Sequence, residues 1–282
     1  MTETSTALVT GANKGIGYAV AAGLAARGMT VLLGSRDRTR GEQAAARLRA
    51  ELTAARKHPE PPSDAHQHAE TPAHSRPHPE TPADGRLREE SAPDVRAIVL
   101  DVTDPATVEA AAASLDRLDV LVNNAGISGP TSQAPGDTPA AIMREVLETN
   151  VIGVLMVTDA MLSLLRRSPA PRIVNVSSGV GSLHHHTDPD HYLSALPPMA
   201  AYPPSKSALN SLTVQYAKQL RKDGILVNAA APGACATDFT KDLPYAITRT
   251  AAQGAAVIIR LATLGPGGPT GGFFDDAGPV PW

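Results

Sequence analysis

The amino-acid sequence predicts an α/β protein with a doubly wound parallel sheet, in a single domain spanning residues 1–282. Short runs rich in Val, Ile and Leu alternate with longer amphipathic segments, which is typical of parallel strands covered by helices on both faces. Three glycines occupy the turn 10–17, between the first apolar run and the first amphipathic segment. Ligands of such folds bind at the carboxyl ends of the strands, where this turn is expected to lie.

The N-terminal half contains four expected strands and three expected helices. The strands are short and apolar, at 7–10, 30–34, 95–100 and 119–122. The helices are expected at 15–27, at the alanine- and arginine-rich stretch 39–57, and at 105–115. Gly28 fits a C-terminal cap of the first helix, and Asp104 with Pro105 fits the N-terminal cap and first turn of the third.

The C-terminal half continues the alternation of strands and helices. A long helix is expected at 139–167, followed by a strand at 172–176. Next come a helix at 205–221, a strand at 225–229, a helix near 251–261 and a last strand around 271–274. The strand–helix repeat therefore extends almost to the C-terminus.

Residues 58–93 interrupt this repeat. They hold eight prolines, five of the nine histidines and a rough decapeptide repeat over 68–87. A segment of this composition buries too little apolar surface to offset its chain entropy. We therefore expect a disordered insertion between the second helix and the third strand. A metal-binding or docking role for its histidines is the alternative, although their spacing follows no zinc pattern.

Composition limits the partners and the compartment. The net charge of −3 gives no reason to expect nucleic acid or an anionic membrane as a partner. Cys235 is the single cysteine, which excludes an internal disulfide and fits a reducing cytosol. The N-terminus lacks the features of a signal peptide, and no run approaches the roughly 20 apolar residues of a membrane span. We expect a cytoplasmic protein.

The glycine-rich turn is the first candidate binding element. Gly11, Gly15 and Gly17 form the pattern Gly-x-x-x-Gly-x-Gly between a strand and a helix. Glycines let the backbone approach a pyrophosphate, and the helix N-terminus offers amide donors and the positive end of its dipole. The turn indicates a dinucleotide site. A turn without a ligand is the alternative for this motif taken alone.

The residues after the second strand bear on which dinucleotide binds. Arg36 offers a planar fork suited to a ribose 2′-phosphate, and Lys14 in the glycine turn adds a second cation. Asp37 stands one position late for the acidic residue of an NAD site and could equally face solvent. The sequence therefore favours NADP(H) over NAD(H).

Two later turns are expected to complete the adenosine side of the site. Asp101 could accept a hydrogen bond from the adenine amino group, with Val102 against the ring; turn chemistry at the strand end is the alternative. Asn123, Ala125 and Gly126 form a turn of small residues, where the backbone can approach the adenosine ribose. A structural Asx turn at the same place is compatible with that role.

Six motifs in order along the chain resemble the short-chain dehydrogenase/reductase family. They are the turn 10–17, the turn 123–126, Asn150 in Asn-x-x-Gly, Ser177-Ser178, Tyr202-x-x-x-Lys206, and Pro232-Gly233 with Thr237. The resemblance runs from Ala7 to the C-terminus without 58–93, and NADPH-dependent carbonyl reductases are the most similar branch. It implies a Rossmann-type fold, NADP(H) as the cofactor and a carbonyl or alcohol substrate.

The resemblance also implies a catalytic set. Tyr202 is expected to protonate the carbonyl oxygen. Lys206, one helical turn further on, is expected to favour the phenolate and so to lower the pKa of Tyr202. Ser178, three residues before Gly181, is expected to bind the substrate oxygen. Asn150 is expected to hold a water in a proton relay behind Lys206.

Further cofactor contacts follow from the same resemblance. They are Asn13 and Ile16 in the glycine turn, Tyr202 and Lys206 themselves, and Pro232, Gly233 and Thr237 near the nicotinamide. Pro203 and Pro204 depart from the family pattern, in which small residues follow the tyrosine. Since proline is tolerated in the first turn of a helix, the helix is expected to begin close to Tyr202.

The substrate side carries weaker patterns. The loop 183–201, which includes Tyr192, is expected to cover the substrate, and Phe239 and Tyr245 lie in a second loop that is expected to close over it. Loop packing is the alternative for both aromatic residues. We expect no metal site at 184–186, because the chemistry needs none, and we expect Cys235 to serve packing. Monomer and homo-oligomer both stay open.

The leading hypothesis is an NADPH-dependent oxidoreductase that reduces a ketone or aldehyde to an alcohol. One alternative is an alcohol or hydroxysteroid dehydrogenase that works oxidatively with NAD(P). A second is a non-catalytic scaffold that keeps the fold and binds a nucleotide.

Overall fold

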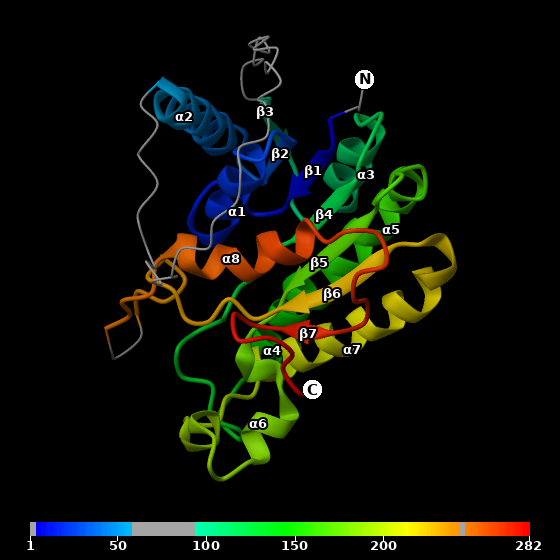
Figure 1. Cartoon of the computed structure of the whole chain (residues 1–282). Helices are drawn as coiled ribbons and strands as arrows, with labels where there is room; N and C mark the ends of the chain where they lie inside the picture. Colours follow the sequence, from blue (N-terminus) through cyan, green and yellow to red (C-terminus); the bar gives the residue numbers. More distant parts are fainter. Residues whose placement is uncertain (1–3, 58–93, 243–245) are drawn as a thin grey trace, which may run out of the picture.

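The computed structural model describes residues 4–57, 94–242 and 246–282 (Figure 1). The predicted insertion 58–93 and the candidate substrate residue Tyr245 lie outside these ranges. Strands and helices alternate through the described chain, so the predicted α/β class is confirmed.

One parallel sheet forms the centre of the fold. Over the described ranges it has seven strands in the order β3-β2-β1-β4-β5-β6-β7. They are β1 (Thr6–Val9), β2 (Thr30–Ser35), β3 (Val95–Val99), β4 (Val120–Asn123), β5 (Arg172–Val176), β6 (Leu226–Ala230) and β7 (Phe273–Phe274). The strand order reverses between β1 and β4. The carboxyl ends of these two strands therefore flank the crevice where a doubly wound sheet binds its ligand.

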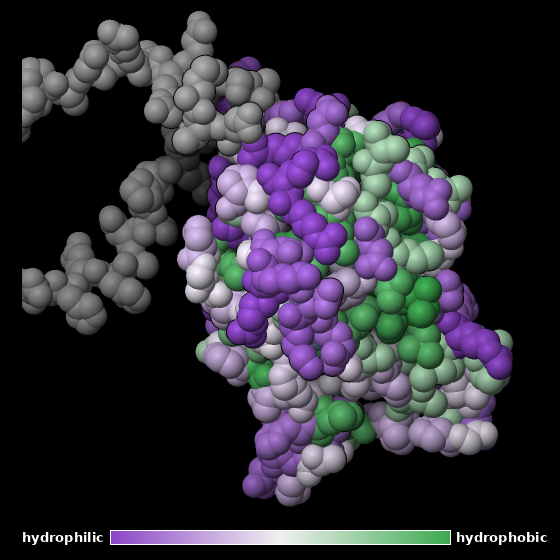
Figure 2. Space-filling model, turned by 90° about the vertical axis from the view of Figure 1, so that its right-hand side faces the viewer, coloured by the Kyte–Doolittle hydropathy of each residue, from purple (hydrophilic) through white to green (hydrophobic). Residues whose placement is uncertain are grey.

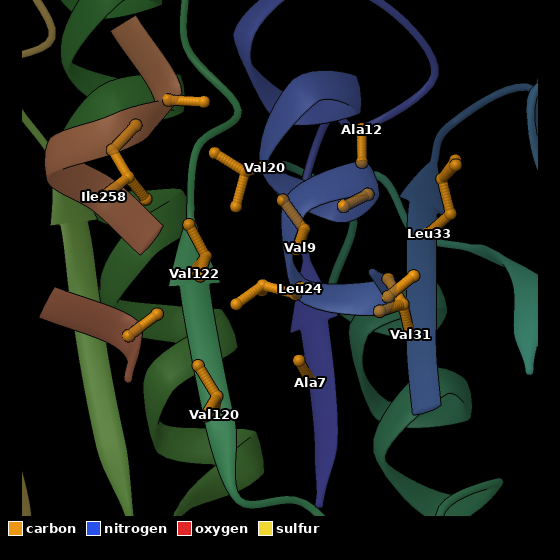
Figure 3. Close-up of a cluster of buried hydrophobic side chains, with 14 of the residues drawn as sticks. Ala7, Val9, Ala12, Val20, Leu24, Val31, Leu33, Val120, Val122 and Ile258 are labelled. Carbon is orange, nitrogen blue, oxygen red and sulfur yellow. The ribbon is translucent and has the colours of Figure 1, made fainter. Parts of the chain in front are cut away.

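The helices cover both faces of the sheet (Figure 1). One face carries α1 (Gly15–Ala25), α2 (Arg38–Lys57) and α8 (Ala251–Ala262), and the other carries α3 (Pro105–Ala113), α5 (Gly153–Leu165) and α7 (Tyr202–Leu220). Successive residues of a strand point to opposite faces, so Leu8 and Val9 belong to different buried clusters. Figure 3 shows the first cluster, to which β1 contributes Val9, α1 contributes Leu24 and α8 contributes Ile258.

Two predicted helix caps are confirmed. Gly28 follows α1 with φ of 81°, a left-handed conformation that glycine adopts without strain. The Asp104 side chain accepts a 3.0 Å hydrogen bond from the Ala106 amide, and Pro105 is the first residue of α3.

The long helix predicted at 139–167 contains a wider turn. α4 (Ala140–Leu147) continues through a π-helical segment, η1 (Glu148–Ile152), into α5. Single π turns inside α-helices occur often at functional sites, and this one holds Asn150.

The run Ala140–Leu165 is long and apolar enough, by length and composition alone, to cross a membrane. The expectation that no stretch reaches this level was therefore wrong. In the fold, Val157, Met161 and Leu165 of α5 are fully buried against the sheet, and this packing accounts for the apolar composition. The surface seen in Figure 2 mixes hydrophilic and hydrophobic residues.

Shorter elements complete the fold around the ends of β5 and β6. The predicted loop 183–201 contains α6 (Leu183–Thr187) and a 3-10 turn, η3 (Tyr192–Ala195), and α6 lies apart from the sheet in Figure 1. Two further 3-10 turns are η2 (Gly179–Gly181) after β5 and η4 (Arg221–Asp223) after α7. The chain end returns to α6, since the Pro281 carbonyl accepts a 2.7 Å hydrogen bond from the Ser182 hydroxyl.

Candidate active site

The glycine turn is held against the turn after β4 by a set of short hydrogen bonds. The Thr10 hydroxyl accepts hydrogen bonds from the Asn124 and Ala125 amides, both at 2.9 Å. In return, the Asn124 side chain donates to the carbonyl oxygens of Thr10 (2.8 Å) and Gly11 (3.2 Å). Neither Thr10 nor Asn124 was among the predicted site residues. The only signal for them was their place inside the two turn motifs.

Two glycines in this turn are required because the turn after β4 packs closely against it. A Cβ atom at Gly17 would lie 2.4 Å from Asn124 Nδ2, and one at Gly11, where φ is 62°, would lie 3.0 Å from Ala125 Cα. Because neither position has room for a side chain, glycine is required at both. The backbones of the two turns can therefore lie in contact at the end of β1.

The start of α1 offers free amide groups to an anion. Lys14 occupies the N-cap position with extended backbone and makes no side-chain capping bond. The amides of the first turn, at Gly15, Ile16 and Gly17, have no intrahelical acceptor by geometry. Together with the helix dipole, these donors fit a pyrophosphate, with Asn13 in the same turn.

Arg36 and Asp37 differ in how they are engaged. The Asp37 carboxylate accepts a 2.9 Å hydrogen bond from the Arg40 amide, so it caps α2, and it also lies 3.7 Å from the Arg40 side chain. The exposed Arg36 guanidinium has no hydrogen bond or ion pair with any described residue. At the end of β2, the cation is therefore the group available to a ligand.

Lys14 forms an ion pair with the segment after β6. Its Nζ atom lies 2.6 Å from an Asp238 carboxylate oxygen in the segment after β6, and both side chains are exposed. This contact lowers the pKa of Asp238, first through the hydrogen bond from Lys14 and then through its charge. Thr237 lies beside the glycine turn as well, since a Cβ atom at Gly15 would be 3.6 Å from Thr237 Cγ2.

The end of β3 is built by a local turn. One Asp101 carboxylate oxygen accepts hydrogen bonds from the amide (3.0 Å) and hydroxyl (2.8 Å) of Thr103. Val102 is buried and packs on Gly153, where a Cβ atom would lie 2.9 Å from Val102 Cγ2. Asp101 thus takes part in the strand-end turn that was the alternative to adenine binding. Its second carboxylate oxygen remains available to a ligand.

The Asn123 side chain points into the protein interior. Its amide donates hydrogen bonds to Thr158 (3.1 Å) and Asn175 (2.9 Å), and Asn175 donates in turn to Thr213 (2.9 Å). This buried network joins β4 and β5 to α5 and α7. A ligand could therefore meet Asn123 through its backbone, whereas Gly126 lies closer to the candidate catalytic groups. A Cβ atom at Gly126 would be 3.1 Å from Asn150 Oδ1 and 3.6 Å from Lys206 Nζ.

Tyr202, Lys206 and Ser178 meet at the carboxyl end of β5. Tyr202 is the first residue of α7, as the two following prolines predict, and Lys206 lies one turn further on. The Lys206 Nζ atom is 5.7 Å from the centre of the Tyr202 ring and donates a 2.9 Å hydrogen bond to the Val176 carbonyl. The Ser178 side chain interacts with the Tyr202 phenol.

Burial dominates the acid–base properties of this pair. It raises the pKa of Tyr202 to about 12, with a smaller opposing effect of the hydrogen bond from Ser178. Burial also lowers the pKa of Lys206 to about 8. Burial therefore outweighs the lowering of the tyrosine pKa that was expected from Lys206, because desolvation penalises both charged forms. At neutral pH the phenol keeps its proton.

The two neighbouring serines have separate environments. The Ser177 hydroxyl is buried and donates a 2.6 Å hydrogen bond to the Asn210 side chain. Asn210 itself donates to the Gly181 carbonyl at 3.2 Å. Ser177 therefore stabilises the packing of β5 on α7, and Ser178 is the serine at the phenol.

Asn150 links the π turn to the start of α7. Its side chain exchanges two hydrogen bonds of 2.9 Å with the backbone of Ile127 and donates a third, of 3.0 Å, to the Ser205 hydroxyl. Ser205 in turn donates to the Tyr202 carbonyl at 2.7 Å. The Asn150 side chain is thus fully engaged in placing the loop after β4 beside Tyr202.

A turn at 232–233 follows the carboxyl end of β6. Gly233 has φ of 71°, and its missing side chain leaves room for Arg249, whose Nε donates to the Pro232 carbonyl at 2.8 Å. Cys235 is buried beneath this turn, and burial raises the pKa of its thiol. That environment fits the predicted packing role of the cysteine.

The candidate substrate residues lie on two separate loops. The Phe239 ring packs on Tyr202 with 5.6 Å between ring centres, although Phe239 is 45% exposed. Tyr192 is 70% exposed and contacts His191, whose ring stacks on His185 at 3.8 Å. The structure therefore brings Phe239 to the candidate catalytic residues. Within the described ranges, no three His, Cys, Asp or Glu side chains are arranged to hold a metal ion.

Comparisons with known proteins agree with this geometry. A sequence profile described as short chain dehydrogenase matches residues 5–72 and 76–247. The chain is 33% identical to a short-chain dehydrogenase from Penicillium roqueforti, over 92% of this chain and 88% of that protein. It is 30% identical to carbonyl reductase (NADPH) 1 from Rattus norvegicus, with 98% of both chains covered.

A solved structure is similar over the whole fold. It is an NADPH-bound carbonyl reductase from chicken fatty liver, with a TM-score of 0.73, 27% identity, and 99% and 100% of the two chains covered. The profile, the relatives and the fold agree with the six motifs. The chain belongs to the short-chain dehydrogenase/reductase family, whose members are oxidoreductases that use NAD(P)(H) and act on carbonyl or alcohol substrates.

Proposed function

We propose that the protein is an NADPH-dependent reductase that converts a ketone or aldehyde into an alcohol. The observation that carries this proposal is the meeting of the Tyr202 phenol, the Ser178 hydroxyl and the Lys206 ammonium at the end of β5. The relatives named carbonyl reductase support the same reaction.

The groups at the carboxyl ends of the strands fit the cofactor. The first turn of α1 would hold the pyrophosphate, Arg36 the 2′-phosphate, and the 232–233 turn with Thr237 the nicotinamide side. Asp101, Val102 and the backbone of 123–126 would line the adenosine side. When bound, NADPH supplies the hydride that adds to the carbonyl carbon.

The protein supplies the proton and the orientation. Ser178 would donate a hydrogen bond to the carbonyl oxygen, and Tyr202 would transfer its phenolic proton to the same oxygen as negative charge develops there. Because burial keeps the phenol protonated at neutral pH, Tyr202 is in the form that reduction needs. Lys206 would stabilise the resulting phenolate until the phenol regains a proton from solvent.

The same observations favour reduction with NADPH over oxidation with NAD. An oxidative enzyme needs a phenolate as the base, and a phenol with a pKa of about 12 supplies little of it near neutral pH. Asp37, the nearest acidic residue for an NAD ribose, caps α2 instead.

A matched pair of tyrosine variants tests the proposal. Turnover of a panel of ketones and aldehydes is followed by NADPH absorbance, with NADH and the corresponding alcohols as comparisons. Tyr202→Phe is expected to lower kcat at least ~100-fold, with NADPH binding retained. The control is Tyr216→Phe on the same helix, which removes a 2.6 Å hydrogen bond to Asp159 outside the site. Unchanged turnover in Tyr202→Phe would leave a nucleotide-binding scaffold as the better explanation.

A further inference from the structure

The N-terminus of α7 lacks an ordinary cap, although it carries Tyr202. The N-cap residue is Ala201, which has no side chain able to accept a hydrogen bond, and no local side chain replaces it. Pro203 and Pro204 remove two of the amides that usually need acceptors in a first turn. The amides of Ala201 and Tyr202 remain; Ala201 is fully buried and Tyr202 is partly buried.

Gln133 satisfies both amides from a distant part of the chain. Its Oε1 atom accepts hydrogen bonds from the Ala201 amide (3.2 Å) and the Tyr202 amide (3.0 Å). Its backbone carbonyl also accepts from the Ala200 amide at 2.8 Å. One residue, 69 positions before Tyr202, therefore acts as the cap of α7.

The other end of the Gln133 side chain is equally engaged. Its Nε2 atom donates 2.6 Å hydrogen bonds to the carbonyls of Ser128 and Pro130, and the residue is only 2% exposed. A Cβ atom at Gly129 would lie 3.1 Å from this nitrogen, so the loop folds tightly around the amide. Both polar atoms of the buried amide are satisfied, which defines one orientation of the side chain.

Tyr202 is thus held on both sides of its backbone. Gln133 binds its amide, and the Asn150–Ser205 pair reaches its carbonyl. The loop 127–133 follows the turn 123–126 that would bind the cofactor. Gln133 therefore connects the cofactor side of the crevice to the residue that would transfer the proton.

We infer that Gln133 is a positioning residue that sets the place of the Tyr202 phenol relative to the cofactor and the substrate oxygen. The inference rests on the proposed role of Tyr202. A displacement of about 1 Å at a reacting group costs up to ~100-fold in rate, so loss of the Gln133 hydrogen bonds lowers kcat. Binding of NADPH does not depend on these hydrogen bonds.

Two substitutions separate positioning from folding. Gln133→Leu has a similar volume and removes all four side-chain hydrogen bonds. Gln133→Glu keeps three of the four when the carboxyl is protonated, because one oxygen can accept from the two amides while the single hydroxyl donates to either Ser128 or Pro130. When ionised, the same carboxylate faces two carbonyl oxygens. Burial and these oxygens raise its pKa.

The expected result is a selective loss of kcat. Gln133→Leu lowers kcat by ~10- to 100-fold with the Kd for NADPH, measured by fluorescence, within about threefold of the wild type. Gln133→Glu is close to the wild type at low pH and loses kcat as the pH rises through the new carboxyl pKa. Gln219→Leu, at an exposed position of α7, is the matched control and keeps full activity.

A double-mutant cycle locates the effect at the phenol. If Gln133 acts through Tyr202, adding Gln133→Leu to Tyr202→Phe lowers the residual kcat no further. Full additivity, or folded Gln133 variants with wild-type kcat at every pH, would overturn the inference. A failure of Tyr202→Phe itself to lower kcat would instead contradict the proposed function, so the two failures are distinguishable.

Discussion

The Nζ atom of Lys206 donates a 2.9 Å hydrogen bond to the carbonyl oxygen of Val176, the last residue of β5. Lys206 as a whole is 5% exposed, and this carbonyl at the end of a central strand accepts the hydrogen bond from its ammonium group. Burial lowers the pKa of Lys206 to about 8, whereas the pKa of Tyr202 is raised to about 12. The two candidate groups therefore lose their protons at well-separated pH values.

The pH dependence of the reduction follows from these values. As the pH rises through about 8, Lys206 loses its charge while Tyr202 stays protonated. We expect kcat/KM for the carbonyl substrate to be constant from pH 6 to about 7.5 and to fall above about pH 8, because kcat/KM reports the free enzyme. The profile is measured from pH 6 to 10. A constant kcat/KM up to pH 10 would contradict the assigned role of the ammonium.

Cofactor preference is expected to depend on Arg36. A charge-assisted hydrogen bond is worth about 1.5–3 kcal/mol, so Arg36→Ala should raise the KM for NADPH roughly 10- to 100-fold. The KM for NADH should not change, because NADH has no 2′-phosphate. Arg38→Ala, which removes a side chain 3.9 Å from Glu42, serves as the control. Equal effects of Arg36→Ala on both cofactors would indicate another binding site for the phosphate.

Phe239 is expected to affect the substrate rather than the cofactor. Its ring covers Tyr202 and stays 45% exposed, so it can contact a ring of the substrate. Aromatic pairs contribute about 0.5–1.5 kcal/mol, so Phe239→Ala should raise the KM for an aromatic ketone roughly 2- to 10-fold. The KM for a small aliphatic ketone should change less. Leu155→Ala, at an exposed position of α5, is the control. If Phe239→Ala raised only the KM for NADPH, this prediction would be contradicted.

Asp119 is expected to stabilise the fold. Its buried carboxylate accepts hydrogen bonds from Arg117, from Ser168 and from the Thr6 amide, at 2.5–3.1 Å. Burial alone would raise its pKa, but these hydrogen bonds outweigh burial and hold the pKa below the usual 3.8. Asp119→Asn should lower the free energy of unfolding by ~2–4 kcal/mol at pH 7.

The sign of the pH effect on Asp119 follows from that shift. A lowered pKa stabilises the folded protein above the unfolded-state pKa, and this contribution is lost as the pH falls through the folded-state pKa. The free energies of urea unfolding of the wild type and of Asp119→Asn should therefore begin to converge below about pH 4 and meet only below the folded-state pKa. Asp223→Asn, at a more exposed pair with Arg166, should cost less than about 1 kcal/mol. Similar losses in both variants would contradict the argument.

The fold was predictable because its signals are local. Hydrophobic runs and caps such as Asp104 depend on neighbouring residues, and the double proline after Tyr202 indicated where α7 begins. Conversely, the π turn around Asn150 differs from an α-helix by a small change in hydrogen bonding. The apolar period alone therefore predicted one unbroken helix.

The site was predictable as a set of residue types, but its energetics were not. The spacing of Tyr202 and Lys206 indicated that they share a side of a helix, whereas their pKa values depend on packing by β5 and the loops around them. Gln133 and Asn124 carried no motif that links them to their partners. The Gln133–Tyr202 contact spans 69 residues, and the Asn124–Thr10 contact spans 114. Such contacts follow from tertiary structure alone.

The π turn at Glu148–Ile152 has a consequence for how this helix tolerates change. A π turn holds one residue more than the regular helix on either side of it. Deleting a single residue there would convert the π segment into regular α-helix. α4 and α5 would then form one continuous helix and keep the same faces toward their neighbours. The amide of Asn150 would then no longer face Ile127 and Ser205, and three buried hydrogen bonds would be lost. The additional residue therefore serves to place Asn150 against the loop after β4, and not to keep the helix continuous.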